Sequence, residues 1–113
     1  MFSNSKFDGD ISYWNVMHVN NMSSMFSHSE FNQDISNWDV SNVENMEMMF
    51  MDSPFNQDIS RWHTIRLINM SNMFDNTPFN HDISRWCLPR LKSYHNAFRR
   101  CNIRKMYIPK NLR

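Results

Sequence analysis

The sequence predicts an α/β repeat fold, a right-handed solenoid with one short parallel strand and one short helix or helical turn in each 24-residue coil. Tryptophan recurs every 24 residues, at Trp14, Trp38, Trp62 and Trp86, and an Asp-Ile-Ser tripeptide precedes each one. Two phenylalanine columns and two columns rich in methionine keep the same period. A unit this short cannot bury its own apolar face, whereas stacked copies can.

The repeat divides the whole chain, which at 113 residues is one domain, 1–113. Residues 1–6 match the end of a unit and form a partial repeat. Four full repeats follow, at 7–30, 31–54, 55–78 and 79–102, and residues 103–113 form a shortened C-terminal repeat. Met1 falls on a repeat methionine, so the chain is either a piece of a longer array or a short gene that starts within a unit.

A strand is expected where apolar and polar residues alternate, as they do around Trp38 and Val40. A helix of about two turns is expected next, because Val43, Met46 and Phe50 have helical spacing. Ser41 and Glu44 have the spacing of a capping box that would start this helix. The regular spacing of the 11 methionines favours core filling over a methionine-lined binding groove.

Charge is divided unevenly along the chain. Residues 1–84 contain all 11 acidic residues and 3 basic ones, and residues 85–113 contain 9 basic residues and no acidic one, so the net charges of −8 and +9 sum to +1. The basic patch predicted at this end comprises Arg90, Lys92, Arg99, Arg100, Arg104, Lys110 and Arg113. Such asymmetry indicates an acidic partner or nucleic acid, or simply a charged solenoid end.

Several classes of protein are disfavoured by composition. No run of 18 apolar residues is present, so no membrane span is expected, and no signal peptide is visible. A cytoplasmic location is therefore expected, with the cell surface as the alternative if the chain is a fragment of a longer secreted protein. A single glycine excludes a Gly-rich phosphate loop, and two cysteines make no disulfide framework.

No metal, cofactor or catalytic residue is predicted. The aspartates of the Asp-Ile-Ser tripeptides are expected to accept backbone hydrogen bonds in turns, with calcium as the less favoured interpretation. The asparagine column of Asn32, Asn56 and Asn80 predicts a side-chain hydrogen-bond ladder. His81, Cys87, His95 and Cys101 lie within one unit, but their spacing does not fit a zinc site.

A binding face is predicted from the positions that vary between units. Alternation places these residues opposite the tryptophans, on an exposed sheet face, where repeat proteins usually bind their partners. The predicted protein-binding residues are Tyr13, Asn15, Asn37, Asp39, Arg61, His63, Arg85, Lys105 and Tyr107.

The unit FNQDISNWDVSNVENMEMMF resembles the 24–26-residue repeat of BspA-like and Mycoplasma-type lipoproteins, a branch of the leucine-rich-repeat-like solenoids. The stretch NAFRRCNIRKMYIPKNL is similar to the BspA-type pattern A-F-x-x-C followed by I-x-I-P. The resemblance implies a binding or adhesion role, usually with a signal or lipid anchor. Similar repeats in viral and phage genomes imply a small interaction protein that acts on a host protein.

The favoured function is thus a non-catalytic protein-binding module on the exposed sheet face, with a partner of unknown identity. One alternative is nucleic-acid binding through the basic patch, where tyrosines would stack on bases. The other is head-to-tail self-association as a structural or adhesion protein, in which the acidic start of one copy meets the basic end of the next.

Overall fold

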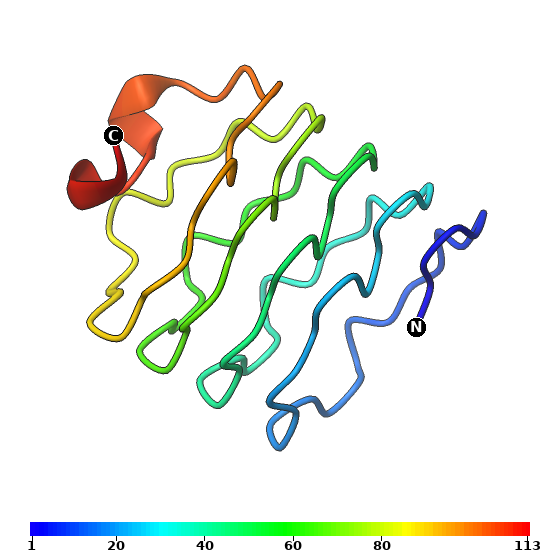
Figure 1. Cartoon of the computed structure of the whole chain (residues 1–113). Coiled ribbons are helices and arrows are strands. Elements are labelled where there is room, and N and C mark those ends of the chain that lie inside the picture. The colour runs from blue at the N-terminus through cyan, green and yellow to red at the C-terminus, as the bar shows by residue number, and fades with distance from the viewer.

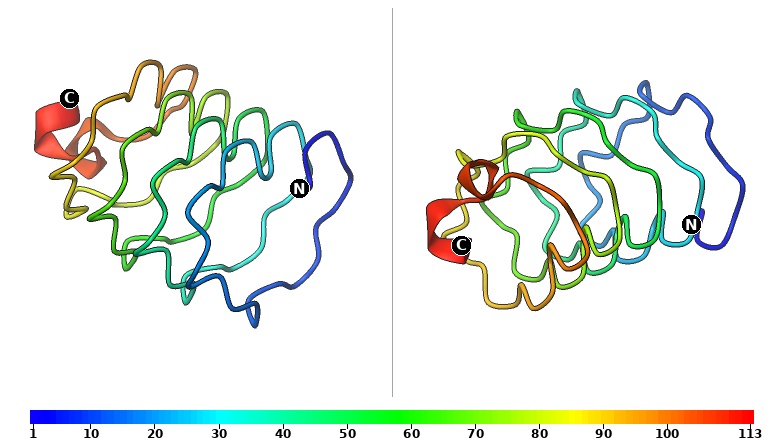
Figure 2. Two further views of the ribbon diagram at one scale, coloured as in Figure 1. Left: turned by 60° about the horizontal axis from the view of Figure 1, so that its bottom comes forward. Right: turned by 90° about the horizontal axis from the view of Figure 1, so that it is seen from above.

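The chain winds into a stack of coils, which Figures 1 and 2 show from three directions. The computed structural model describes residues 1–113 and measures 33 × 30 × 20 Å. Backbone hydrogen bonds join each coil to the next one at the sequence period: Met22 N donates to Asn45 O, Met46 N to Asn69 O and Met70 N to Ser93 O, each at 2.8 Å. The 24-residue sequence period is therefore the period of the stack.

The predicted strand and helix of each coil are both wrong. The helices present are two short 3₁₀-helices near the C-terminus, η1 (Lys105–Tyr107) and η2 (Lys110–Leu112). No strand forms, and parallel pairing is limited to three isolated bridges: Asn21 with Asn45, Asn45 with Asn69, and Asn69 with Ser93. The protein is therefore not an α/β solenoid of the leucine-rich-repeat type, because its coils consist almost entirely of turns and irregular backbone.

Left-handed residues explain why the helix does not form. Met48 has a φ of 55° and Asp52 a φ of 58°, and a residue in this conformation cannot continue a right-handed helix. Positive φ recurs at the equivalent places of the other coils: Ser24, His28, Asn72, Asn76, Asn96 and Arg100. The predicted capping box is also absent, because the Ser41 backbone N–H and hydroxyl both donate to Asp39 within a local turn.

Hydrogen bonds between coils replace the missing bonds within a helix. The N–H groups at alternate positions of the second coil donate to carbonyls of the third: Met46 to Asn69 at 2.8 Å, Met48 to Ser71 at 2.9 Å, Phe50 to Met73 at 3.0 Å and Asp52 to Asp75 at 2.9 Å. Four donors thus point in one direction along the stack axis. Inter-coil bonding satisfies backbone groups that would otherwise be buried without partners.

Two turns explain why the strand does not form. Trp38 N donates to Ile35 O at 3.2 Å and Val43 N donates to Val40 O at 3.0 Å, so only a short wall of the coil lies between the turns. The predicted alternation of burial does occur there: Trp38 and Val40 are buried, whereas Asn37 and Asp39 are exposed. Without inter-coil pairing along this wall, however, no exposed sheet face exists.

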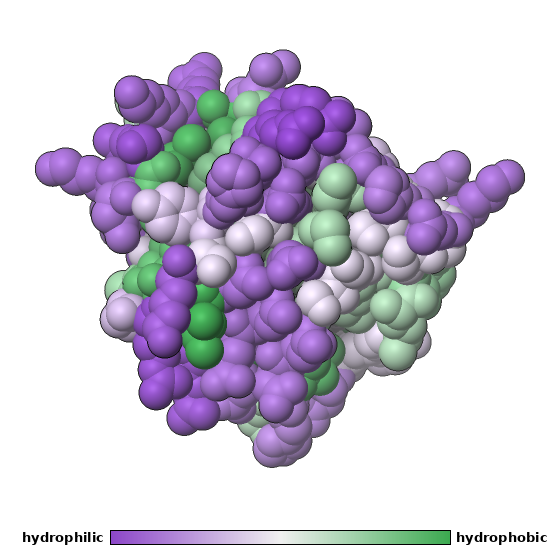
Figure 3. Space-filling view, viewed as in Figure 1, coloured by the Kyte–Doolittle hydropathy of each residue, from purple (hydrophilic) through white to green (hydrophobic).

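The core consists of aromatic columns with methionine beside them, as the period predicts. The rings of Phe26 and Phe74 each lie 5.8 Å from the ring of Phe50, and Phe55 stacks beside it at 3.9 Å. Five methionines are buried, in agreement with core filling: Met22, Met46, Met49, Met70 and Met73. The outer face shown in Figure 3 is mostly hydrophilic with scattered apolar areas, because the large apolar side chains lie inside the stack.

Buried indoles add a directional bond to this packing. The Nε1–H groups of Trp38, Trp62 and Trp86 donate at 3.1 Å to the carbonyls of Ile11, Ile35 and Ile59 in the preceding coil. Each large aromatic group therefore satisfies its polar atom while it fills the core. Because the same bond recurs in three coils, it holds successive coils in register.

A side-chain ladder runs along another edge and confirms the prediction for the asparagine column. The carboxamide Oδ1 atoms of Asn32, Asn56 and Asn80 accept from the backbone N–H of Asn56, Asn80 and Arg104 at 2.9, 3.0 and 3.0 Å. In the first coil Asp8 has this role, and its Oδ1 accepts from the Asn32 backbone N–H at 2.8 Å. These amide groups are structural, since each one satisfies backbone of the next coil.

Substitution of Met48 by asparagine is expected to stabilise the protein by about 0.5 kcal/mol, because asparagine tolerates left-handed backbone better than methionine does. Asn72 and Asn96 already occupy this place in the later coils. Urea unfolding measures the effect. The matched control is Met46→Asn, which places an amide at a fully buried position and should destabilise the protein. A Met48→Asn variant less stable than the wild type would contradict this account.

Candidate functional site

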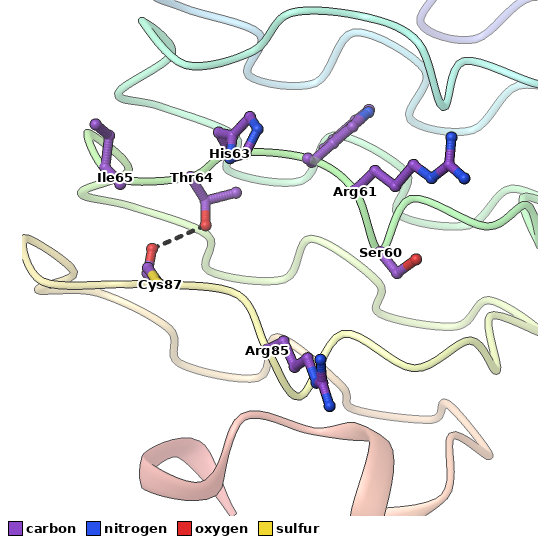
Figure 4. A pocket seen from close by; sticks show the side chains of 8 residues that line it. Ser60, Arg61, His63, Thr64, Ile65, Arg85 and Cys87 are labelled. Atoms are coloured by element: carbon purple, nitrogen blue, oxygen red, sulfur yellow. Dashed lines mark hydrogen bonds between the residues drawn. The ribbon is translucent and has the colours of Figure 1, made fainter.

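A hollow of about 490 Å³ opens between the third and fourth coils (Figure 4). Three of the predicted binding residues line it: Arg61 and His63 from the third coil, and Arg85 from the fourth. The remaining lining residues are Ser60, Trp62, Thr64, Ile65 and Cys87. We call this site the arginine hollow.

Two contacts between the coils hold the floor of the arginine hollow. The rings of Trp62 and Trp86 stack at 6.2 Å with an interplanar angle of 12°. Thr64 replaces the valine found in the earlier coils, and its hydroxyl donates to the Cys87 carbonyl at 2.9 Å (Figure 4). Thr64 is 1% exposed and the bond is partly buried, so it helps to fix the spacing of the two coils beneath the site.

The two arginines and the histidine of the hollow are free to contact a ligand. The side chains of Arg61, His63 and Arg85 are exposed and form no hydrogen bond or ion pair within the protein. Guanidinium groups present several fixed donors and bind carboxylates or phosphates in a bidentate manner. The hollow can therefore receive an anionic group, with the exposed Ile65 offering apolar contact beside it.

A second hollow adjoins the first and has the opposite chemistry. Its volume is about 270 Å³, and its lining comprises Asp34, Ser36, Gln57, Asp58 and Arg61. Arg61 thus lies between a site with an exposed arginine and histidine and a site with two carboxylates. A partner that spans both would meet positive and negative groups in a fixed order.

The other six predicted binding residues lie outside the arginine hollow. Tyr13, Asn15, Asn37 and Asp39 are exposed on the first two coils, and the last two of the six, Lys105 and Tyr107, belong to η1. Asn15 and Asp39 accept hydrogen bonds from their own turns, at Met17 N and Ser41 N, both at 3.1 Å. The expected strand position of Lys105 and Tyr107 is wrong, because the chain forms a 3₁₀-helix there.

Sequence reasoning missed Ile65 as a lining residue. Ile65 is 50% exposed at a corner of the third coil, where the other units have Met17, Ser41 and Pro89. Isoleucine is uncommon at an exposed turn corner, and its presence at this position could have identified Ile65 as a candidate binding residue.

The residues of the predicted basic patch differ in the contacts they form within the protein. All seven residues are exposed, yet Arg100 donates to Asp75 at 3.0 Å, and Arg113 donates to the carbonyls of Ile108 and Met106 at 2.9 and 3.1 Å. These two arginines stabilise the fold. Lys92 borders one hollow together with Arg90 and a second with Tyr94 and His95, so positive charge gathers along one edge of the fourth coil.

The aspartates of the repeated tripeptide act as turn acceptors, as predicted. The carboxylates of Asp10, Asp34, Asp58 and Asp82 each accept from the backbone N–H two residues later at 2.9 Å. Hydrogen bonds from the backbone and hydroxyl of Ser60 hold the pKa of Asp58 below its ordinary value, and the serines that follow the other three lower their pKa values in the same way.

Potential metal and thiol chemistry has little support in the geometry. The structure gathers no group of three or more His, Cys, Asp or Glu side chains that could hold a metal ion. Burial raises the pKa of the Cys101 thiol, whose Sγ donates to the Phe79 carbonyl at 3.2 Å. Cys101 is therefore a poor nucleophile, whereas Cys87 is exposed in the arginine hollow.

Acid should destabilise the wild type more than a variant in which Asp10, Asp34, Asp58 and Asp82 are all asparagine. The folded-state pKa values of these carboxyls lie below their ordinary 3.8. Their ionised forms therefore stabilise the fold above about pH 4, and this stabilisation is lost as pH falls through the folded-state values. Asparagine keeps the Oδ1 acceptor without titrating. Urea unfolding at pH 7 and at pH 3 measures how much stability each protein loses on acidification. Equal losses in the wild type and the variant would contradict the prediction.

Comparison with other proteins locates the chain within one family. Comparison with curated proteins and with solved structures gave no match. None of the protein's helices has the length and apolar character needed to span a bilayer. A family model described as "Mycoplasma protein of unknown function, DUF285" matches residues 1–110, and the chain with its 24-residue repeat therefore belongs to this family.

Proposed function

We propose that the protein is a non-catalytic protein-binding module whose partner places acidic groups in the arginine hollow. The observation that carries this proposal is that Arg61, His63 and Arg85, from two successive coils, line one hollow and form no hydrogen bond or ion pair within the protein. A positively charged side chain left free in a formed hollow has donors available for a ligand. The inter-coil bond of Thr64 supports a hollow that is already shaped before binding.

The mixed character of the hollow supports a protein partner. Ile65 offers exposed apolar surface at the other end of the hollow from the guanidinium groups (Figure 4), and arginine is among the residues enriched at energetically important interface positions. The neighbouring carboxylates of Asp34 and Asp58 add a negative region that would disfavour a uniformly anionic ligand. A protein surface with acidic, apolar and basic groups in sequence fits this arrangement.

Affinity capture from native cells, with mass spectrometry, identifies the partner. The test variant replaces Arg61, His63 and Arg85 with alanine. The control variant replaces Lys6 and His18 with alanine, and both of these residues are exposed near the start of the chain. The test variant should lose the partner, and the control should retain it. Equal capture by the test variant and the wild type would disprove the assignment of this site.

Thiol alkylation then locates the contact without mutation. Cys87 lies in the hollow and is exposed, so bound partner should slow its reaction with iodoacetamide at least about tenfold. Cys101 serves as an internal control, since burial already raises the pKa of its thiol. Unchanged Cys87 reactivity in the complex would place the partner elsewhere.

A closer relation to BspA-like repeats is also part of this proposal. Its support is the C-terminal sequence, in which Ala97, Phe98 and Cys101 are followed by Ile108 and Pro109. The relation concerns the repeat sequence and a binding role, and it does not extend to a coil with a strand and a helix.

A further inference from the structure

The last full coil presents a row of backbone N–H groups without acceptors. In each of the first three coils, four alternate N–H groups donate to carbonyls of the next coil. The equivalent groups of the fourth coil form no hydrogen bond, and they belong to Tyr94, Asn96, Phe98 and Arg100. We call these four groups the donor edge.

A free acceptor lies at the start of the donor edge. The carbonyls of Asn20, Glu44 and Ile68 each accept two N–H groups from the following coil, whereas the equivalent carbonyl of Lys92 accepts none. The fourth coil therefore presents the same donors and acceptor that the inner coils use for inter-coil bonds, on a side that residues 1–113 do not cover. Unpaired rows of this kind are templates for the addition of another segment.

The backbone conformation of the donor edge is already that of the bonded coils. Asn96 has a φ of 57° and Arg100 a φ of 53°, compared with 56° at Asn72 and 57° at Asn76 in the third coil. Successive N–H groups oriented in one direction by such alternation attract negative charge or carbonyl oxygens. An incoming segment would meet donors that need no rearrangement.

The C-terminal residues leave this edge open. Residues 103–113 follow the other side of the fourth coil, where Arg104 N donates to Asn80 Oδ1 at 3.0 Å and Ile83 N donates to Tyr107 O at 3.0 Å. They then turn into η1 and η2, shown in red in Figure 1. Residues 103–113 thus fill part of the place that a fifth coil would take and leave the side of the donor edge open to a short segment.

The surroundings of the donor edge are basic. Arg90, Lys92, His95 and Arg99 are exposed along it, and Tyr94 is 44% exposed. Arg100 contributes only its backbone N–H to the donor edge, because its guanidinium is bound to Asp75. No acidic residue occurs after Asp82 in the sequence, so carboxylates on the incoming segment would meet no repulsion from this region of the chain.

We propose that the donor edge binds a short acidic segment of a partner protein. The main-chain carbonyls of the segment accept from Tyr94, Asn96, Phe98 and Arg100, and one of its N–H groups donates to the Lys92 carbonyl. Its carboxylates lie beside Lys92 and Arg99. This site is separate from the arginine hollow and does not depend on the function proposed for the hollow.

Two matched decapeptides test the proposal. The acidic probe is VENMEMMFMD, residues 43–52, whose carbonyls at Asn45, Glu47, Met49 and Met51 accept from the same donor positions of the first coil. The control is LKSYHNAFRR, residues 91–100, which comes from the equivalent place in the fourth unit. The side chains of the probe carry a charge of −3 (Glu44, Glu47, Asp52) and those of the control +3 (Lys92, Arg99, Arg100).

Amide hydrogen exchange, measured by NMR on the whole chain at low salt, gives the readout. The acidic probe at saturation should slow exchange of the four donor-edge amides at least about tenfold, since each gains an acceptor. The amides of Met70, Asn72, Phe74 and Asn76 already have acceptors and should not change. The basic control peptide should protect none of the eight.

A charge-reversal variant separates main-chain from charge recognition. Lys92→Glu with Arg99→Glu should weaken probe binding at least about tenfold, whereas Lys6→Glu at the far end of the stack should leave it unchanged. Probe binding that protects other amides, or equal binding of the basic peptide, would overturn the proposal. So would a single-stranded oligonucleotide that protects the edge when the acidic peptide does not. If neither peptide binds, the positive charges serve to prevent unwanted pairing and the proposal fails.

Discussion

Phe50→Ala is expected to destabilise the protein by about 3–5 kcal/mol, because it removes a large ring from the centre of the core. Phe50 is fully buried, and four aromatic rings surround it: Phe26, Phe55, Trp62 and Phe74. The column cannot collapse around alanine, since hydrogen bonds between coils hold the rungs apart. Total stabilities of domains are about 5–15 kcal/mol, so urea unfolding should show a large fall in midpoint.

Phe98→Ala is the matched control for this prediction. Phe98 ends the same column, is half-buried and has one aromatic neighbour, Phe74, at 5.7 Å. The same truncation there should cost only about 1–2 kcal/mol, because part of the ring already contacts solvent. If both substitutions cost the same, the stack does not derive its stability from its inner rungs.

Arg100→Ala is expected to destabilise the protein, although by less than the loss of the Phe50 ring. Asp75 is 1% exposed, and its carboxylate accepts from Arg100 Nε and from Asn72 Nδ2, both at 3.0 Å. Removal of Arg100 leaves a buried carboxylate with one neutral donor, and an uncompensated buried charge is destabilising. The arginine side chain is itself half exposed, which keeps the expected cost below that of a fully buried ion pair. Thermal and urea unfolding of the variant measure it.

Two controls show whether the cost arises from the stranded charge. Arg99→Ala removes an exposed neighbouring arginine and should change stability by less than about 0.5 kcal/mol. Arg100→Ala combined with Asp75→Met, which copies Met51 of the second unit, should recover most of the loss. No recovery in the double variant would assign the effect to lost packing of the arginine.

The pH dependence of the Arg100→Ala variant gives an independent check. In the wild type, burial raises the pKa of Asp75, but the hydrogen bonds from Arg100 and Asn72 and the arginine charge outweigh it and leave the pKa below 3.8. The ionised Asp75 carboxylate therefore stabilises the wild type until the pH falls through this lowered pKa. In the variant the hydrogen bond and charge of Arg100 no longer lower the pKa of Asp75, so the carboxyl protonates at a higher pH than in the wild type. The stability difference between the two proteins should accordingly narrow toward pH 3, and a constant difference would contradict the argument.

Part of the candidate site was predictable, and part was not. Exposure of Arg61, His63 and Arg85 followed from alternation with the buried tryptophans, because a wall residue beside a buried indole points outward. Their grouping into one hollow without Asn37 or Tyr107 depends on where each coil turns, and the sequence spacing contains no information about that. The donor edge is further from prediction, since it consists of backbone groups and becomes visible only when the bonding of all four coils is compared.

The sequence alone determined that the chain stacks in 24-residue units and which side chains fill the stack. Large apolar residues that recur at a constant interval are buried when each packs against the equivalent residue of the next unit. This burial does not require a particular backbone geometry. The tertiary structure alone decided the backbone. Val43, Met46 and Phe50 could face a core equally well from a helix or from a run of turns. Left-handed residues such as Met48 are tolerated because the N–H groups around them bond to the adjacent coil, and those partners lie about 24 residues away in the sequence.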